Sequence, residues 1–325
     1  MHEDDALKFF DEHLSVKNSA GSVVLQPALI ATLYFDQSFT HAARAAVVEC
    51  CEYYIGLCGS SLRWAWNPMA RRMQSMQRIG DKEGLSPREW LDQGDEDKNW
   101  AVIYHGAAHQ RGASSYLFDA LGSNRTQRLL GFVKIAFPIL WFTEHGGRMV
   151  DVVTHMCNKL KPVSGYSGIG IIESPDLATS VDYEPIVYQI AQRFPGLEVD
   201  YPESHCMYLR DGIKGVNWLT VLGEGWVSKL GGAAAIRSAV MGMDSRFAVH
   251  DVDGGIIIQA GERPSLGDMD RGVWPELYTQ LAAYLKPIRM SRHRPFQHGS
   301  PADQPGTLRF DKERSEAWLR RFDGR

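Results

Sequence analysis

The sequence predicts an α+β fold built from two similar strand–helix–strand halves, with mainly antiparallel sheets covered by helices. First, a long apolar run followed by an amphipathic helical pattern occurs twice, at residues 23–58 and again at 166–194. Second, Asp253-Gly254 stands between two apolar runs, which is a typical hairpin signal and favours antiparallel pairing. Third, 44% hydrophobic and 23% charged residues are ordinary values for a globular protein. No clear sequence repeat accompanies the two halves, so their duplication is a hypothesis.

The first half opens with the best-defined strand and helix. Val23–Phe35 is a long apolar run, and Pro27 inside it indicates one strand with an irregular start or an edge position. Thr40–Cys58 has a continuous apolar stripe at helical spacing, and Gly59 is expected to end this helix. The other elements expected before residue 163 are a helix at Asp4–His13, a linker at Lys17–Ser22, strands at Ser61–Trp66, Trp100–His105 and Leu129–Trp141, a helix-permissive stretch at Met69–Ile79, a short helix carrying Trp90 and Leu91, and a helix at Gly146–Leu160.

The second half is organised around Asp211–Gly232. Within it, Gly215–Leu222 is short, apolar and partly β-branched, which predicts a buried strand. Trp226–Leu230 then places two apolar side chains on one face of a short helix, and Gly231-Gly232 is a suitable stop. The other elements expected here are a strand at Tyr166–Ile172, a helix at Tyr183–Phe194, hairpin strands at Phe247–Val252 and Gly255–Gln259, a helix at Val273–Leu285 and a short terminal helix at Asp311–Phe322.

These elements predict three segments. Residues 1–22 are an N-terminal helix and linker. Residues 23–288 form the α+β domain, with halves at about 23–162 and 163–288 and an acidic insertion at about 69–98. Residues 289–325 form a basic tail, because the chain from Lys286 onward has ten Lys/Arg and five Asp/Glu. A solvated surface segment is the favoured interpretation of such a tail.

Cysteine usage and the N-terminus predict a cytoplasmic protein. The five cysteines are odd in number and irregularly spaced, which argues against a disulfide framework. The acidic, amphipathic N-terminus lacks the basic start and apolar core of a signal peptide. No apolar run reaches membrane-spanning length, so no membrane association is expected.

No motif assembles a recognisable active site, and we therefore predict a protein that is not an enzyme and has no cofactor or metal. His105 and His109 are four residues apart, but the glycines around them favour a loop with two unrelated histidines. Asp251 and Asp253 could hold a divalent metal, which leaves a metal-dependent hydrolase as one alternative. The same Asp-Gly is explained equally well by a turn. A second alternative is a nucleic-acid-binding module that uses the basic run at 289–294.

Two stretches carry a resemblance to a known family. GYSGIGIIESP at Gly165–Pro175 and GVNWLTVLGEGWVSKLGG at Gly215–Gly232 resemble the type VI secretion immunity family, formerly a domain of unknown function. The similarity runs from about Val23 to about Ile288, and the chain departs from the family pattern at Arg71–Lys98 and after Pro287. The resemblance implies a bacterial protein that binds and neutralises a toxic effector, often a nuclease, by covering its active site or its assembly surface.

The partner-binding surface is expected to be acidic. Nucleases must present positive charge to phosphate, and the body of the chain before Lys286 is acidic, which disfavours direct nucleic-acid binding. Asp81–Asp97 has seven acidic and two basic residues around Trp90, which is either a binding hot spot or a residue that pins the insertion. The candidate interface residues in the insertion are Glu83, Trp90, Asp92, Asp95, Glu96 and Asp97, and those on a second-half surface are Glu173, Asp176, Asp182, Glu184, Asp200 and Glu203.

Overall fold

The structure is a computed structural model. It describes residue 10 and residues 14–66, 76–79, 87–91, 94–127, 129–145, 147–297 and 307–324. The helix expected at Asp4–His13 lies outside these residues, apart from Phe10. Phe10 is buried and contacts Phe194 edge-on, with 5.2 Å between the ring centroids.

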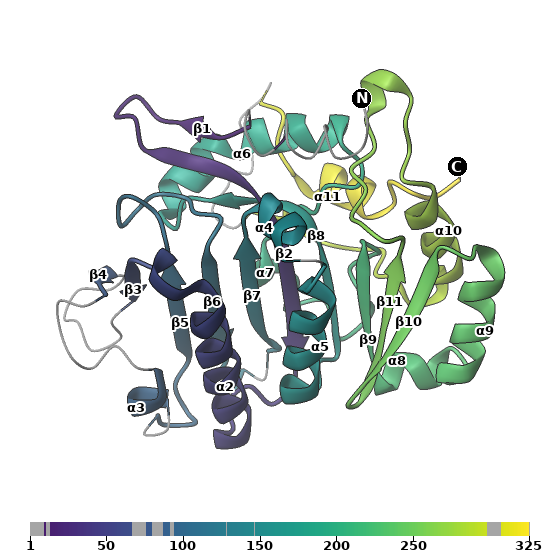
Figure 1. Cartoon of the computed structure of the whole chain (residues 1–325), viewed down its shortest axis with the longest axis horizontal. Coiled ribbons are helices and arrows are strands. Elements are labelled where there is room, and N and C mark those ends of the chain that lie inside the picture. Colours follow the sequence, from purple (N-terminus) through teal and green to yellow (C-terminus); the bar gives the residue numbers. More distant parts are fainter. Residues whose placement is uncertain are drawn as a thin grey trace.

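Within the described residues, the strands form one eleven-stranded sheet in which every neighbouring pair is antiparallel (Figure 1). The strand order is β10-β11-β9-β8-β2-β7-β6-β5-β3-β4, and β1 pairs with β2. The strands are β1 Val16–Lys17, β2 Val23–Phe35, β3 Trp64–Trp66, β4 Met76–Arg78, β5 Trp100–His105, β6 Leu117–Gly122, β7 Gly131–Phe137, β8 Ser164–Glu173, β9 Leu219–Gly223, β10 Phe247–Val252 and β11 Gly255–Ala260.

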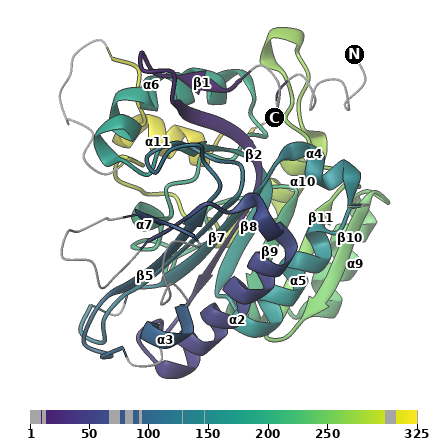
Figure 2. The same ribbon diagram turned by 60° about the vertical axis from the view of Figure 1, so that its left-hand side comes forward.

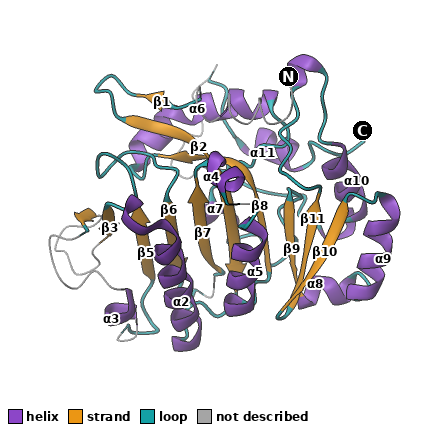
Figure 3. Cartoon of the chain, in the orientation of Figure 1, coloured by secondary structure: helices purple, strands orange, loops and turns teal. Residues whose placement is uncertain are grey.

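Helices lie on both faces of this sheet, as Figure 3 shows by colour. The α-helices are α2 His41–Cys58, α3 Pro87–Leu91, α4 Ile139–Glu144, α5 Met149–Leu160, α6 Leu177–Arg193, α7 Pro202–His205, α8 Glu224–Lys229, α9 Ala233–Met243, α10 Glu276–Tyr284 and α11 Lys312–Leu319. Short 3-10 turns occur at Gly59–Ser61, Met269–Arg271 and Lys286–Ile288. The mixed helical and antiparallel content confirms the predicted α+β class.

Alternate residues of the central strands face two separate hydrophobic cores. Leu29 and Leu33 of β2 pack in the core with α2 and α5, whereas Tyr34 packs in the core with α6 and α11. Figures 1 and 2 show α2 and α5 over one face and α6 and α11 over the other. Both faces of β2 and β8 are therefore buried, which explains why these strands read as almost continuous apolar runs.

Local signals placed several elements correctly. The Thr40 hydroxyl caps α2 by accepting a hydrogen bond from the Ala43 N–H at 3.2 Å, and Gly59 ends the helix with φ +54°. The β10–β11 hairpin turns at Asp253-Gly254 as predicted, and Gly254 has φ +80°. Pro27 lies in β2 between the residues paired with β1 and those paired with β7. Proline has no backbone N–H to donate, and at this position β2 is paired with β8 on one side and with neither β1 nor β7 on the other.

Other predictions were wrong in part. Met76–Arg78 is a strand rather than part of a helix, and the predicted linker contributes to β1. The strand β6 and the helix α9 were not predicted. The strand expected from Gly215 begins only at Leu219, because the Asn217 side chain accepts from the Trp218 N–H at 2.7 Å. Such local side-chain bonds compete with ladder bonds. Pro138 ends β7 and precedes α4, so the expected strand Leu129–Trp141 is shorter.

The predicted duplication is not confirmed. From the centre outward, the first half has the order β2-β7-β6-β5, and the second has β8-β9-β11-β10. In the first half, the strand beside β2 is β7, which is the last strand of that half in the chain. In the second half, the strand beside β8 is β9, which is the next strand in the chain after β8. Both halves belong to one continuous sheet, joined through ten antiparallel residue pairs between β2 and β8.

The segment after residue 288 is not a solvated tail. Phe296, Phe310, Trp318 and Leu319 are buried in the core beside α6, and Phe322 is buried in the opposite core. The Phe310 N–H donates to Glu184 Oε1 at 2.9 Å. The segment is buried through contacts with residues far away in the chain, which its weak periodicity does not indicate.

Candidate functional site

The acidic loop, which we define as residues 94–99 between α3 and β5, is anchored by hydrogen bonding to a buried arginine. Arg44 of α2 donates through Nη2 to the carbonyl oxygen of Asp95 at 2.7 Å. A Cβ at Gly94 would lie 2.1 Å from Arg44 Nη1, so glycine lets the loop approach the guanidinium. The Asp95 carboxylate accepts from the Asp97 N–H at 2.9 Å. The backbone of the loop is therefore fixed, while the side chains of Asp95 and Asp97 are exposed.

Glu96 differs from its two neighbours because it has a partner within the chain. Its carboxylate forms an ion pair with Arg125, and its carbonyl oxygen accepts from the Arg125 N–H at 3.0 Å. Asp95 and Asp97 are thus the exposed carboxylates of this loop that form no ion pair with another described residue. Glu83 and Asp92 lie outside the described residues, as does the side chain of Trp90 in α3.

The second acidic group is not a continuous surface. Glu184 and Asp200 are buried, and Glu173 is half-buried, so these three do not offer free carboxylates to a partner. Asp176 caps α6 by accepting from the Thr179 N–H at 3.1 Å and the Thr179 hydroxyl at 2.8 Å. Asp182 and Glu203 are exposed, and their contact with a partner stays a prediction.

Asp200 is the centre of a buried polar network on the sheet. Its carboxylate accepts from the Tyr166 hydroxyl at 2.6 Å and the Thr32 hydroxyl at 2.8 Å, and it lies 3.1 Å from Lys134 Nζ. Burial raises the pKa of Asp200, but the positive charges of Lys134 and Lys214 and these hydrogen bonds outweigh burial and lower it. Asp200 is therefore a structural anion that joins β2, β7 and β8.

The two stretches that carry the family resemblance meet at this network. Lys214 Nζ donates to Glu198 Oε1 at 2.5 Å and lies 4.7 Å from the centre of the Tyr166 ring. Asn217 Nδ2 donates to the other oxygen of Glu198 at 2.8 Å. A Cβ at Gly168 would lie 1.9 Å from Asn217 Oδ1, so glycine is required there. The motif residues thus interlock two parts of the fold.

A buried histidine pair flanks the network. The Tyr201 N–H donates to His205 Nε2 at 3.1 Å, so the proton of a neutral His205 is on Nδ1. That nitrogen lies 3.1 Å from His293 Nε2, and His293 Nδ1 lies 2.6 Å from the carbonyl oxygen of Arg294. Burial, with the nearby charge of Lys214, lowers the pKa of His205 well below its usual value.

The candidates for metal chemistry do not come together. Asp251 is exposed and its carboxylate lies 2.8 Å from Arg237 Nη2, while the N–H of exposed Asp253 donates to Asn158 Oδ1 at 2.8 Å. Among the described residues, no group of three His, Cys, Asp or Glu side chains is placed to hold a metal ion. Asp251 and Asp253 therefore belong to no such group among these residues.

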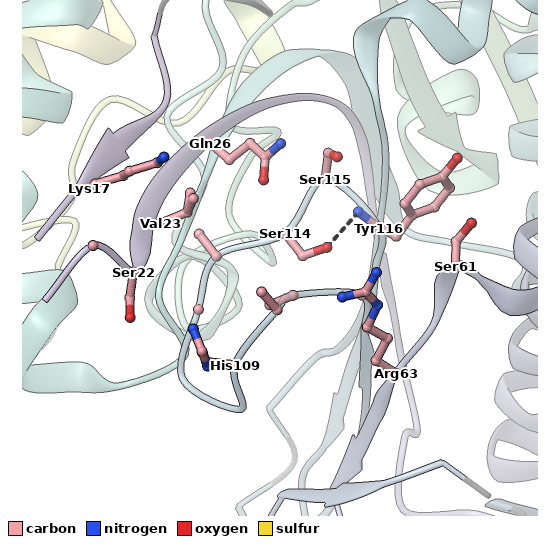
Figure 4. A pocket seen from close by; sticks show the side chains of 16 residues that line it. Lys17, Ser22, Val23, Gln26, Ser61, Arg63, His109, Ser114, Ser115 and Tyr116 are labelled. Carbon is pink, nitrogen blue, oxygen red and sulfur yellow. Dashed lines mark hydrogen bonds between the residues drawn. The ribbon is translucent and has the colours of Figure 1, made fainter.

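Two adjoining cavities of about 490 and 570 Å³ share Ser22 and His109. They lie between the β1–β2 hairpin, β3 and the loop 106–116 that joins β5 to β6. We call this the basic groove and define it by six of its polar lining residues, which are Lys17, Ser22, Arg63, His109, Ser114 and Ser115 (Figure 4). Sequence reasoning missed it, because its residues are far apart in the chain and form no motif.

Comparisons with known proteins identify the family. Residues 46–322 match the family model described as type VI immunity for VRR-NUC (TsiV). The chain therefore belongs to this family of type VI secretion immunity proteins, and the resemblance seen in the sequence is confirmed.

One solved structure is similar over nearly the whole chain. The Pseudomonas aeruginosa T6SS protein PA0821 superposes with a TM-score of 0.85 and 24% sequence identity, covering 99% of this chain and 91% of that chain. At 24% sequence identity, this similarity shows a shared fold and no more. A search of curated proteins found no match. In the part of the chain that the structure describes, no helix is long and apolar enough to cross a membrane.

Proposed function

We propose that this immunity protein binds a cognate type VI effector nuclease of the VRR-NUC class and neutralises it by covering its active site or its assembly surface. The observation that carries the proposal is the family match over residues 46–322. We further propose that the protein acts in the cytoplasm without membrane contact, does not bind nucleic acid directly, and is not an enzyme.

The electrostatics of the acidic loop support binding to a nuclease. A nuclease must present positive charge to DNA or RNA phosphates, and exposed carboxylates on a fixed backbone complement such a face. Asp95 and Asp97 meet this requirement, because their loop is anchored through Arg44 and Arg125. A preorganised loop loses little conformational entropy on binding.

Inhibition titrations test the function directly. The purified chain should abolish the activity of the effector nuclease that co-purifies with it, at a fixed molar ratio that does not change with incubation time. Asp251→Ala/Asp253→Ala should inhibit equally well and keep its melting temperature, because both side chains are exposed. Inactivation of excess nuclease by a trace of the chain, increasing with time and lost in the double variant, would instead establish the hydrolase alternative.

A further inference from the structure

The lining of the basic groove includes two exposed cations, Lys17 and Arg63. Within the described part of the chain, no ion pair involves Lys17 or Arg63, and both side chains are exposed. Arg111 lines the adjoining cavity and lies 3.9 Å from Asp176, whose carboxylate also caps α6. In a protein of net charge −4, Lys17 and Arg63 are therefore two exposed cations at one cavity that no described carboxylate neutralises.

The groove also presents hydroxyl donors. Ser114 and Ser115 are each only 7% exposed, and both line the cavity. The Ser114 Oγ accepts from the Tyr116 N–H at 3.1 Å, as Figure 4 shows, which leaves its proton for another acceptor. Ser115 has no hydrogen bond among the described residues. Lysine and arginine side chains only donate, so a ligand that fits this lining must be rich in acceptors and negatively charged.

The walls of the groove are fixed before any ligand arrives. The Ala113 N–H donates to the carbonyl oxygen of Val23 at 2.9 Å, which ties the loop 106–116 to β2. A Cβ at Gly106 would lie 2.3 Å from the carbonyl oxygen of Ser61, so the loop also packs tightly on the turn that follows α2. Binding therefore requires little reordering of this part of the chain.

We propose that the basic groove binds an Asp/Glu-rich segment of the effector nuclease, which rests on the proposed function. Figure 4 shows Lys17 and Arg63 at opposite sides of the cavity, so they suit carboxylates carried at separate positions of one extended segment. Nucleic acid fits less well. A phosphate backbone is bound by many cations along an open basic face, whereas Lys17 and Arg63 are the two Lys or Arg side chains that line this cavity.

A charge-reversal experiment with a matched control tests this assignment. Lys17→Glu/Arg63→Glu should bind the co-purifying effector nuclease at least about tenfold more weakly than the unaltered chain. Lys286→Glu/Arg292→Glu makes the same charge change at exposed positions outside the groove and should bind about as well as the unaltered chain. Equal affinity of the groove variant and the control variant, with unchanged melting temperatures, would overturn the proposal.

Crosslinking identifies the bound segment and its chemistry. With p-benzoylphenylalanine in place of His109, illumination of the complex should label an Asp/Glu-rich segment of the effector. Labelling of a basic or apolar segment, or none, would overturn the proposal. Fluorescence anisotropy with a labelled single-stranded oligonucleotide tests nucleic acid as the ligand. Oligonucleotide binding that is lost in Lys17→Glu/Arg63→Glu would show that the groove binds phosphate and would overturn the proposal. If the unaltered chain forms no complex with a nuclease, the proposed function fails first, independently of the groove.

Discussion

His205 illustrates how one buried residue couples the stability of this fold to pH. The Tyr201 N–H occupies its Nε2, and a proton added to that nitrogen would break this bond and place a charge in a buried site near Lys214. The folded-state pKa lies below the unfolded value of about 6.5, so the unfolded chain binds the proton more readily. Stability from neutral His205 is present above pH 6.5 and is lost as pH falls towards the folded-state pKa.

We predict that His205→Gln has a smaller loss of unfolding free energy between pH 7 and pH 5 than the unaltered chain. The difference should be on the order of 2 kcal/mol, because one proton is bound on unfolding over most of this range. Urea denaturation at several pH values measures it. His109→Gln, which changes an exposed histidine, is the control and should keep the original dependence. Parallel curves for the unaltered chain and His205→Gln would contradict the prediction.

Glu173 should act in the opposite direction. Burial raises the pKa of its carboxyl to about 7, although hydrogen bonds from Ser180 and Tyr201 oppose this. Because the folded state then holds the proton more tightly, its contribution to stability grows as pH falls from about 7 towards 4.5. Glu173→Gln should therefore lose less stability than the unaltered chain when pH is raised from 6 to 8. An unchanged slope in the same denaturation experiment would show that Glu173 remains ionised.

At the scale of elements, the acidic loop is a preorganised feature whose charges should act on the association rate. Asp95→Asn/Asp97→Asn keeps hydrogen-bond acceptors for the loop and removes both charges. We predict a roughly 3- to 10-fold slower association with the effector nuclease at low salt, and a difference that fades as salt screens the charges. Stopped-flow or surface-plasmon measurements over a salt series test this. Asp251→Asn/Asp253→Asn removes the same charge elsewhere and should associate normally, and a loop variant that behaves like this control would place the interface elsewhere.

The C-terminal segment is an element of the core rather than an accessory. Truncation after Gly306 removes the buried side chains of Phe310, Trp318 and Phe322, so we predict loss of stability instead of the dispensability expected of a solvated tail. Phe310→Ala alone should reduce the unfolding free energy by about 3–5 kcal/mol. Leu308→Ala, which changes a side chain that is 46% exposed, is the matched control and should change it little. Thermal melting tests all three, and equal melting temperatures would mean that the segment does not pack as described.

At the scale of the whole molecule, the sequence predicted what is local and missed what is distant. Thr40, Gly59 and Asp253-Gly254 act on their neighbours, so the helix boundaries and the hairpin could be read directly. The pairing of Lys134 with Asp200 joins residues 66 positions apart, and no local pattern distinguishes that buried aspartate from an exposed one. The same limit applies to the candidate site, because exposure of Asp95 was predictable while burial of Glu184 depends on the distant C-terminal segment.

The continuous sheet also predicts how the molecule unfolds. Because β2 and β8 pair along ten residues at the centre, opening one half would expose apolar surface and unpaired backbone of the other. Phe118 of β6 and Ile257 of β11 are fully buried on opposite sides of that centre. We predict that Phe118→Ala reduces the protection of slowly exchanging amides by the same free energy, about 3–5 kcal/mol, in both β6 and β11. Ile257→Ala should likewise affect both strands, by about 2–5 kcal/mol. Native-state hydrogen exchange measures each strand separately. Faster exchange confined to the strand that carries the substitution would show that the halves open independently, as two separate domains would.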